Sequence, residues 1–365
     1  MRNIQQTELH TSTLALEDVS GTCGNASEIF QERCACGRQR YDPSPIRRPN
    51  EQQQCTDIVS DAYKQLVASL TRIVTQYPPA EVRAGGGLYT GPTSIAYLFL
   101  ILQQQYADLA IEDHQLGTWS AAYLKQAQDH IKSFPGPRVG KCGIMDDILA
   151  LLAIGAASSK DADMAAELCD YVAEAVDPES ENEWLYGRAG YLYFLRLVKA
   201  SFIDDERTSR LLKDTAAEVV ETILESPRPW KWHGKAYVGA VHGAFGIITQ
   251  IVLTDPDRYA PKVEAELAVL LSYQYEGGNW PSSIPPGKDR LVQVCHGAPG
   301  VVNCLVSIRH YFPNLHDRID ASIKRARECI WERGLLTKEP CLCHGMPRQD
   351  RSCLTHANAV SRYHG

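Results

Sequence analysis

The chain has 365 residues, of which 44% are hydrophobic, and a formal net charge of −7. This length is enough for one large domain or two ordinary ones with a sizeable core. The acidic balance argues against a nucleic-acid partner. The longest apolar runs, at 95–102 and 148–157, are too short to cross a bilayer and predict buried helices.

The N-terminal sequence has no secretory hydrophobic region, and Arg2 follows Met1 where myristoylation needs glycine. The twelve cysteines are scattered without the dense spacing of a disulfide framework, which is typical of thiols kept reduced. We therefore expect a cytoplasmic protein without a transmembrane segment. The sequence leaves peripheral association with a membrane open.

Taken in chain order, residues 1–50 are polar and end in a stretch rich in proline and arginine at 43–49. Such a segment buries little surface, so we expect a disordered arm. From residue 51 onward apolar side chains recur at helical spacing, first at Ile58, Ala62 and Leu66. The pattern predicts a helical domain over 51–345 and a divergent tail over 346–365.

Within this domain a glycine precedes an apolar run about every fifty residues, which is typical of a repeat of two helices. The apolar runs at 92–103, 144–156, 189–198, 244–253 and 298–308 alternate with helices charged on one side, such as 259–273 and 315–334. This alternation predicts an all-α toroid with an inner and an outer ring of helices. An open solenoid is the alternative. The repeat glycines are Gly91, Gly143, Gly187, Gly243, Gly297 and Gly345.

Three of these glycines follow side chains that can carry chemistry. His242 precedes Gly243, and Cys-His pairs at 295–296 and 343–344 precede Gly297 and Gly345. Zinc binds thiolate and imidazole, and three protein ligands leave a fourth position open, as in catalytic sites. Two thiols and an imidazole therefore predict a zinc ion that activates a sulfur nucleophile.

Five blocks of the sequence resemble the lanthionine synthetase C-like family, and its eukaryotic branch more than its bacterial cyclases. They occur in the family's order and spacing over roughly residues 55–345. The resemblance implies an α/α toroid of seven inner and seven outer helices, with zinc at the glycine-lined end. The blocks lie at 88–97, 184–191, 232–243, 289–301 and 331–345.

The resemblance also implies roles for single residues. His242 matches the family's acid/base histidine, Glu183 matches its acidic partner, and Lys338 matches a lysine implicated in glutathione binding. One zinc ion per chain is expected. The positions that match its ligands are Cys295, Cys343 and His344.

Bacterial relatives add cysteine thiols to dehydroalanine or dehydrobutyrine in a peptide, and eukaryotic relatives add glutathione to such residues in damaged proteins. The implied partners are glutathione and proteins or peptides that contain dehydroamino acids. A zinc-bound thiol is deprotonated and attacks the β-carbon. His242 then protonates the α-carbon, with Glu183 orienting it. Arg188 and Lys338 are expected to hold a substrate carboxylate or the enolate oxygen.

Two departures from the family pattern stand out. Val294 occupies a position where the family usually has tryptophan, and after Gly345 the pattern gives way to a polar run with Pro347. Proline disfavours an immediate buried helix. We therefore expect about six of the family's seven repeats, in a C-terminally truncated chain.

Two other classes of function compete with the enzyme hypothesis. A toroid with a missing repeat could be a scaffold that binds zinc and glutathione without turnover. Glycosidases and terpenoid cyclases share the architecture but need paired carboxylates or aspartate-rich segments. Asp146 and Asp147 are the candidate pair, and a helix cap is the expected role at their position.

Overall fold

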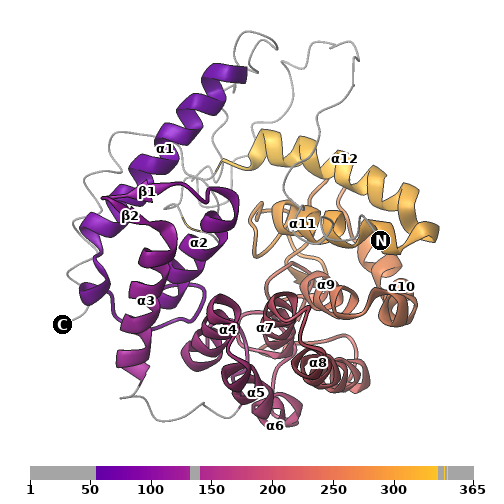
Figure 1. Ribbon diagram of the computed structural model, residues 1–365. Helices are drawn as coiled ribbons and strands as arrows, with labels where there is room; N and C mark the ends of the chain where they lie inside the picture. Colours follow the sequence, from indigo (N-terminus) through magenta and orange to yellow (C-terminus); the bar gives the residue numbers. More distant parts are fainter. Residues whose placement is uncertain (1–54, 132–139, 336–340, 342, 344–365) are drawn as a thin grey trace, which may run out of the picture.

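The structure is a computed structural model that describes residues 55–131, 140–335, 341 and 343. The arm and the tail expected at 1–50 and 346–365 lie outside these residues. The described part is mostly helical, as Figure 1 shows. Its helices are α1 (Cys55–Gln76), α2 (Pro92–Gln105), α3 (Leu116–Ile131), α4 (Asp147–Ser159), α5 (Ala162–Asp170), α6 (Val172–Val176), α7 (Arg188–Ser201), α8 (Glu206–Glu225), α9 (Ala244–Thr254), α10 (Pro256–Ser272), α11 (Ala298–Ile308) and α12 (His316–Arg333), with short 3-10 turns at Pro79–Glu81, Arg309–Tyr311 and Pro313–Leu315.

The helices form two concentric layers. The inner layer is the series α2, α4, α7, α9 and α11, in which each helix packs against the next. The outer helices α3, α5, α8, α10 and α12 pack against this series, and α6 packs against α7 and α8. Figure 1 shows the inner helices as an arc from α2 to α11, with no described helix between its two ends. The architecture is the expected α/α toroid, and the five predicted inner helices are confirmed.

The two layers start their helices differently. The inner helices α2, α7, α9 and α11 begin directly after a repeat glycine and have no side-chain cap. The outer helices α5, α8 and α10 begin with an aspartate whose carboxylate accepts a backbone N–H of the first turn. The inner helix α4 is the exception, because Asp146 caps it by accepting from Leu149 N (2.9 Å). The cap expected at this aspartate pair is confirmed.

A second glycine follows three of the repeat glycines at a spacing of three residues. A Cβ atom on Gly190, Gly246 or Gly300 would lie 2.2, 1.8 or 1.9 Å from the carbonyl oxygen six residues earlier. Real side chains do not tolerate such distances, so only glycine lets the incoming loop fold back onto the first turn of the helix. Three successive loops therefore fold back onto their helices at the same point, although the φ of the repeat glycine is +122° before α11 and −118° and −121° before α7 and α9.

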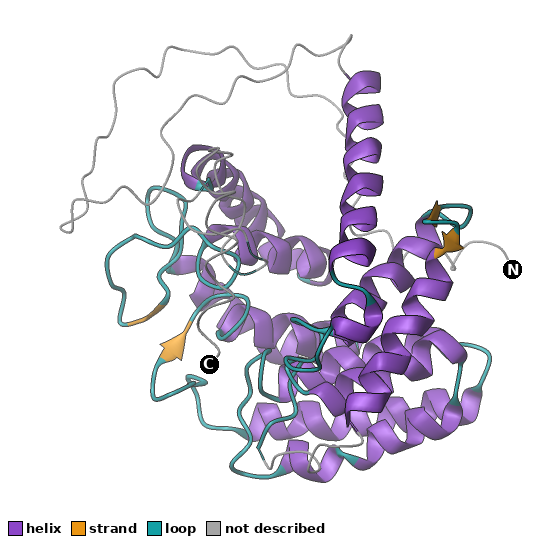
Figure 2. Cartoon of the chain, turned by 90° about the vertical axis from the view of Figure 1, so that its left-hand side faces the viewer, coloured by secondary structure: helices purple, strands orange, loops and turns teal. Residues whose placement is uncertain are grey.

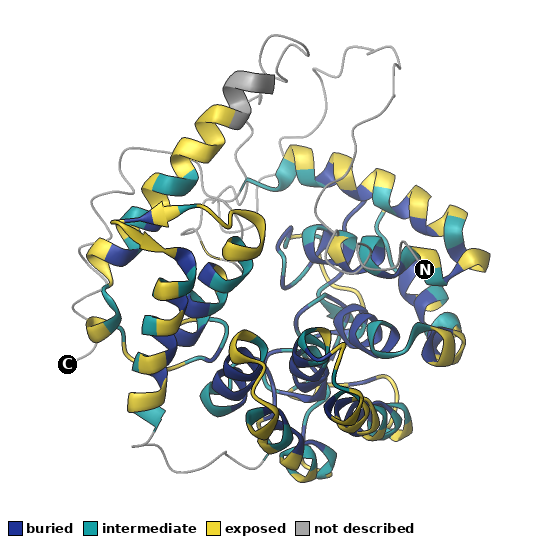
Figure 3. Cartoon of the chain, viewed as in Figure 1, coloured by how far each residue is buried: buried dark blue, intermediate teal, exposed yellow. Residues whose placement is uncertain are grey.

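Burial follows the two layers. Every residue of α4 from Leu149 to Ala156 is buried, and so is every residue of α9 from Phe245 to Val252. Figure 3 shows the outer helices with exposed faces turned to solvent. The run at 95–102, expected to form a buried helix, is not fully buried, because Leu98 of α2 is 38% exposed. This helix ends the described arc and packs against the outer helix α3 and the inner helix α4.

The strands are minor features. β1 (Ala110–Ile111) pairs with β2 (His114–Gln115), and β3 (Ala236–Tyr237) pairs with β4 (Ser283–Ile284), both antiparallel. Figure 2 shows these short strands at the margins of the helical body, and α1 with one end projecting beyond it. Within the described ranges, no helix is long and apolar enough to span a membrane.

Candidate active site

The loops that precede the inner helices lie edge to edge at one end of the toroid. Backbone hydrogen bonds join most neighbouring loops. The loops before α9 and α11 instead make close backbone contact, because a Cβ on Gly239 would lie 2.3 Å from Cys295 O. The site residues therefore sit on a connected backbone framework. Its bonds run from Leu88 N to Ile144 O (2.8 Å), from Ile144 N to Trp184 O (3.3 Å), from Trp184 N to Val241 O (3.0 Å) and from Cys295 N to Cys343 O (3.4 Å).

Glu183 and His242 form a buried pair on this framework. His242 Nδ1 lies 2.7 Å from Glu183 Oε2, and the Glu183 side chain is 1% exposed. The carboxylate also accepts the backbone N–H groups of Leu185 (3.0 Å) and Tyr186. A buried carboxylate needs such partners. The histidine and acidic residue that the sequence pairs are thus in direct contact.

Aromatic rings surround His242. Its imidazole lies parallel to the indole of Trp232, with ring centroids 4.0 Å apart and an interplanar angle of 5°. The rings of Tyr237 and His296 lie 6.1 and 5.7 Å away. His296 also lies 5.3 Å from Tyr237, and its backbone carbonyl accepts from Gln293 N (3.1 Å). These contacts restrict the orientation of the histidine ring.

The two described thiols of the predicted zinc set are neighbours. Cys295 is 3% exposed and its thiol contacts that of Cys343. Hydrogen bonding from Cys295 lowers the pKa of Cys343 to about 6, assisted by the Tyr89 hydroxyl and the charge of His242 and opposed by burial. The same thiol contact, together with burial, raises the pKa of Cys295. The arrangement favours one thiolate next to one thiol.

This donor set fits a zinc ion. Adjacent sulfur ligands with a stabilised thiolate are what zinc binds. The third predicted ligand, His344, lies outside the described residues. Among the residues that are described, no group of three metal-capable side chains gathers. Cys341 is exposed and interacts with Tyr89.

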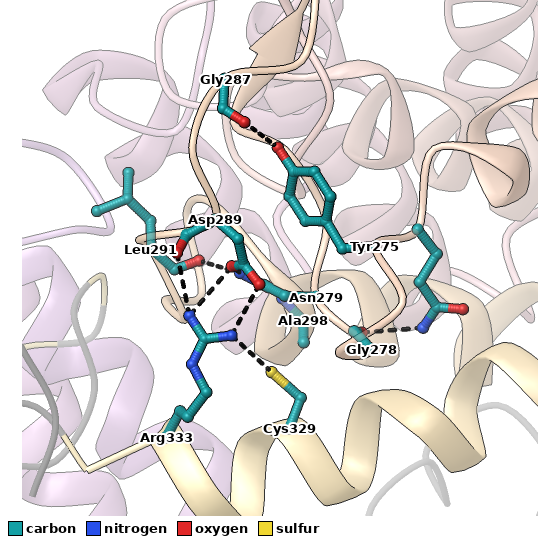
Figure 4. A network of polar contacts seen from close by, with 10 residues as sticks. Tyr275, Gly278, Asn279, Gly287, Asp289, Leu291, Ala298, Cys329 and Arg333 are labelled. Carbon is teal, nitrogen blue, oxygen red and sulfur yellow. Dashed lines mark hydrogen bonds and ion pairs between the residues drawn. The ribbon is translucent and has the colours of Figure 1, made fainter. Parts of the chain in front are cut away.

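A polar network anchors the segment 285–297, which carries Cys295 and which we name the cysteine loop. Figure 4 shows Arg333 of α12 forming an ion pair with Asp289, at 2.8 and 3.1 Å. Asn279 donates to Asp289 Oδ1 (2.6 Å) and to Leu291 O (2.9 Å), and its own oxygen accepts from Ala298 N (2.7 Å). The network ties the cysteine loop to the start of α11 and the end of α12.

The structure corrects the role expected for Arg188. Its side chain is 3% exposed and donates to the carbonyl oxygens of Ala175 (2.6 Å), Asp177 (2.7 Å) and Ser180 (2.6 Å), and to Asn182 Oδ1 (2.7 Å). Four of the five N–H groups of a guanidinium are therefore used by the end of α6 and the loop between α6 and α7. We assign Arg188 to holding that loop in place of the expected substrate contact.

The other candidate residues separate into two groups. Lys338 and His344 lie outside the described residues, so their expected roles stay predictions. His233, which directly follows Trp232 in the sequence, is exposed and lies edge-on to the Trp232 ring, with centroids 4.3 Å apart.

Sequence reasoning missed Tyr89 and the contact made by Trp232. Tyr89 has a detectable signal, because it lies two residues before Gly91 as Cys295 and Cys343 lie two residues before their own glycines. Tyr89 joins the first described loop to Cys343 through its hydroxyl. Equivalent positions of the repeat thus meet in space, although their side chains differ in type.

Comparison with known proteins agrees with this geometry. A model of the family described as "Lanthionine synthetase C-like protein" matches residues 83–347. The chain belongs to this family.

Individual proteins of known name are also similar to this chain. The protein is 31% identical over 184 residues to "Glutathione S-transferase LANCL1" of Danio rerio, and the match covers 45% of this chain and 44% of that relative. The chain thus spans less than half the length of this curated relative. The solved structure of "Nisin cyclase" superposes with a TM-score of 0.53 over 79% of each chain at 11% identity. At that identity the likeness supports the toroid fold alone.

Proposed function

We propose that this protein adds the thiol of glutathione to dehydroalanine or dehydrobutyrine residues of proteins or peptides, with a thioether as the product. The observation that carries the proposal is that two pairs of side chains, Glu183–His242 and Cys295–Cys343, lie close together on the loops at one end of the toroid. The Glu183–His242 pair lies close enough to Cys343, itself in contact with Cys295, for charges to interact. The name of the zebrafish relative supports glutathione as the thiol.

Zinc, held by Cys295, Cys343 and His344, would supply a Lewis acid that favours the thiolate form of a substrate sulfhydryl. In the reaction the sulfur forms a bond to the β-carbon, and the electrons of the carbon–carbon double bond move to the carbonyl oxygen as an enolate. The enolate collapses as the α-carbon takes a proton. The thiol loses one proton and the α-carbon gains one, so the addition needs no oxidant or reductant.

His242 is the proposed proton donor to the α-carbon. Glu183 accepts from Nδ1, which leaves Nε2 as the nitrogen that can hold and deliver the proton. Glu183 balances the charge of the imidazolium in a buried setting. Lys338 is proposed to bind a carboxylate of glutathione. We propose a cytoplasmic location with these roles, because a reducing compartment keeps thiols available as metal ligands and nucleophiles.

The test uses the full chain loaded with zinc, glutathione and a peptide that contains dehydroalanine. Mass spectrometry should detect a thioether adduct whose formation is lost in Cys343→Ala and strongly slowed in His242→Gln. Cys169→Ala is the matched control, because it removes a buried thiol from the outer helix α5. Binding of glutathione by calorimetry without any adduct would instead favour the scaffold function, and equal rates in Cys343→Ala would reject the proposed site.

A further inference from the structure

Trp232 covers one face of the imidazole of His242. The two rings are parallel within 5°, and their centroids are 4.0 Å apart, which is van der Waals contact of stacked rings. Trp232 is half-buried, and its indole also runs parallel to the ring of Tyr186 at 6.1 Å. The indole therefore sits within an aromatic cluster next to the proposed proton donor.

The backbone holds Trp232 in this place. Trp232 N donates to Lys235 O (2.9 Å), and Lys235 N donates to Trp232 O (3.0 Å), which closes a tight turn. The two central residues, His233 and Gly234, have φ angles of +47° and +74°. Two consecutive left-handed residues define the type of turn that favours antiparallel pairing. The turn leads directly into β3, which is hydrogen-bonded to β4, so the indole is carried by a paired segment.

Two restraints therefore act on the same ring. The hydrogen bond from Nδ1 to Glu183 fixes one edge of the imidazole but leaves its plane free to tilt. The stack with Trp232 fixes the plane, and the two together determine the direction of Nε2. We propose that Trp232 is a positioning residue for His242, holding the plane of its ring through the stacked contact of the two rings.

This inference rests on the proposed function, in which His242 delivers a proton. Other groups also face the imidazole. Glu183 contacts its edge, the rings of Tyr237 and His296 lie at 6.1 and 5.7 Å, and Cys343 interacts with it electrostatically. Trp232 differs from them in lying parallel and in contact with the ring face.

The kinetic test compares Trp232→Leu with Trp232→Phe in the zinc-loaded full chain. Leucine removes the π face, whereas phenylalanine keeps one. We expect kcat for glutathione addition to fall about tenfold in Trp232→Leu, the scale of one stacked aromatic contact, with a much smaller change in KM for glutathione. Trp232→Phe should recover most of the loss. Wild-type kcat in Trp232→Leu, or equal loss in both variants, overturns the inference.

The second test reads the contact without turnover. A protonated imidazole in contact with an indole quenches its fluorescence, so the emission of Trp232, isolated as the difference between wild type and Trp232→Phe, should fall on acidification. His242→Gln should abolish this fall. His233→Gln is the matched control, since His233 touches the same indole edge-on, and it should leave the fall intact. Quenching that survives in His242→Gln, or that disappears only in His233→Gln, overturns the inference.

The two tests separate two kinds of failure. If wild type forms no adduct, the proposed function fails, and the fluorescence result alone decides whether Trp232 stacks on His242. If wild type forms the adduct but the variants behave alike, the positioning role fails and the proposed function stands.

Discussion

Replacing Glu183 by glutamine perturbs the pair on which the proposed proton transfer depends. The carboxylate is 1% exposed and accepts three hydrogen bonds, from Leu185 N, Tyr186 N and His242 Nδ1. An amide offers one oxygen and one NH2 group in place of two oxygens, so at least one donor loses its acceptor whichever way the amide turns. A buried donor without a partner costs about 1–3 kcal/mol. We expect the free energy of unfolding to fall by that amount.

The effect on catalysis should be larger than the effect on stability. The imidazolium of His242 loses its charged partner, and a positioned acid–base group contributes at least about 100-fold in rate, or about 2.7 kcal/mol. We therefore expect kcat to fall about 100-fold, measured from adduct formation, with unfolding followed by circular dichroism in urea. Wild-type kcat in Glu183→Gln would refute the role of the pair. Unchanged stability would refute the hydrogen-bond count.

Glu181→Gln is the matched control on the same loop. Burial raises the pKa of Glu181, and the charge of Glu183 raises it further, against the opposing effects of His233 and Arg188. A raised pKa means that folding favours the protonated form. The stability contributed by Glu181 is therefore present below its ordinary pKa and lost as pH rises through the raised value. In urea unfolding we expect equal or slightly higher stability than wild type at pH 7, no gain at pH 4, and unchanged kcat.

Two further predictions concern the framework of the cysteine loop. Gly300→Ala puts a Cβ 1.9 Å from Val294 O, so we expect a loss of about 1–3 kcal/mol in urea unfolding and less bound zinc by metal analysis. Gly287→Ala, whose Cβ would meet nothing within 4 Å, should change neither, and equal behaviour of the two variants would contradict the packing argument. Arg333→Met removes the ion pair with Asp289, which is partly exposed, and should cost about 1 kcal/mol. Stability equal to wild type would show that the pair does not hold the loop.

The helix starts could be predicted from sequence because glycine is required where a loop folds back onto a helix, and this requirement repeats along the chain. The Glu183–His242 pair followed from matching positions in a family pattern. The role of Arg188 could not be predicted, since three of its acceptors are backbone carbonyls that no side-chain pattern encodes. The stack of Trp232 depends on a turn in which His233, a non-glycine residue, takes a positive φ.

The exposed face of α2 was missed for a different reason. The periodicity of a helix reports how apolar its faces are, but not whether a neighbour is present to cover each of them. Leu98 has the side chain of an inner helix, and it is exposed because α2 ends the described arc. The contact between Asn279 and Asp289 was missed as well. It joins the loop after α10 to the segment after β4. Asparagine and aspartate are usually exposed to solvent, so their residue types gave no sign of this contact.

Backbone hydrogen bonds join neighbouring loops at the end of the toroid, so these contacts between loops do not depend on which side chains stand before the repeat glycines. The two positions before each described repeat glycine carry tyrosine, cysteine or histidine in different repeats, and the loops still contact one another through their backbones. Substitution of one or two residues before a repeat glycine can therefore change which reactive side chain the loop carries. Leu185 and Val241 occupy such positions with buried apolar side chains, so cysteine, which tolerates burial, is the nucleophile or metal ligand that a designer could install there at the lowest cost.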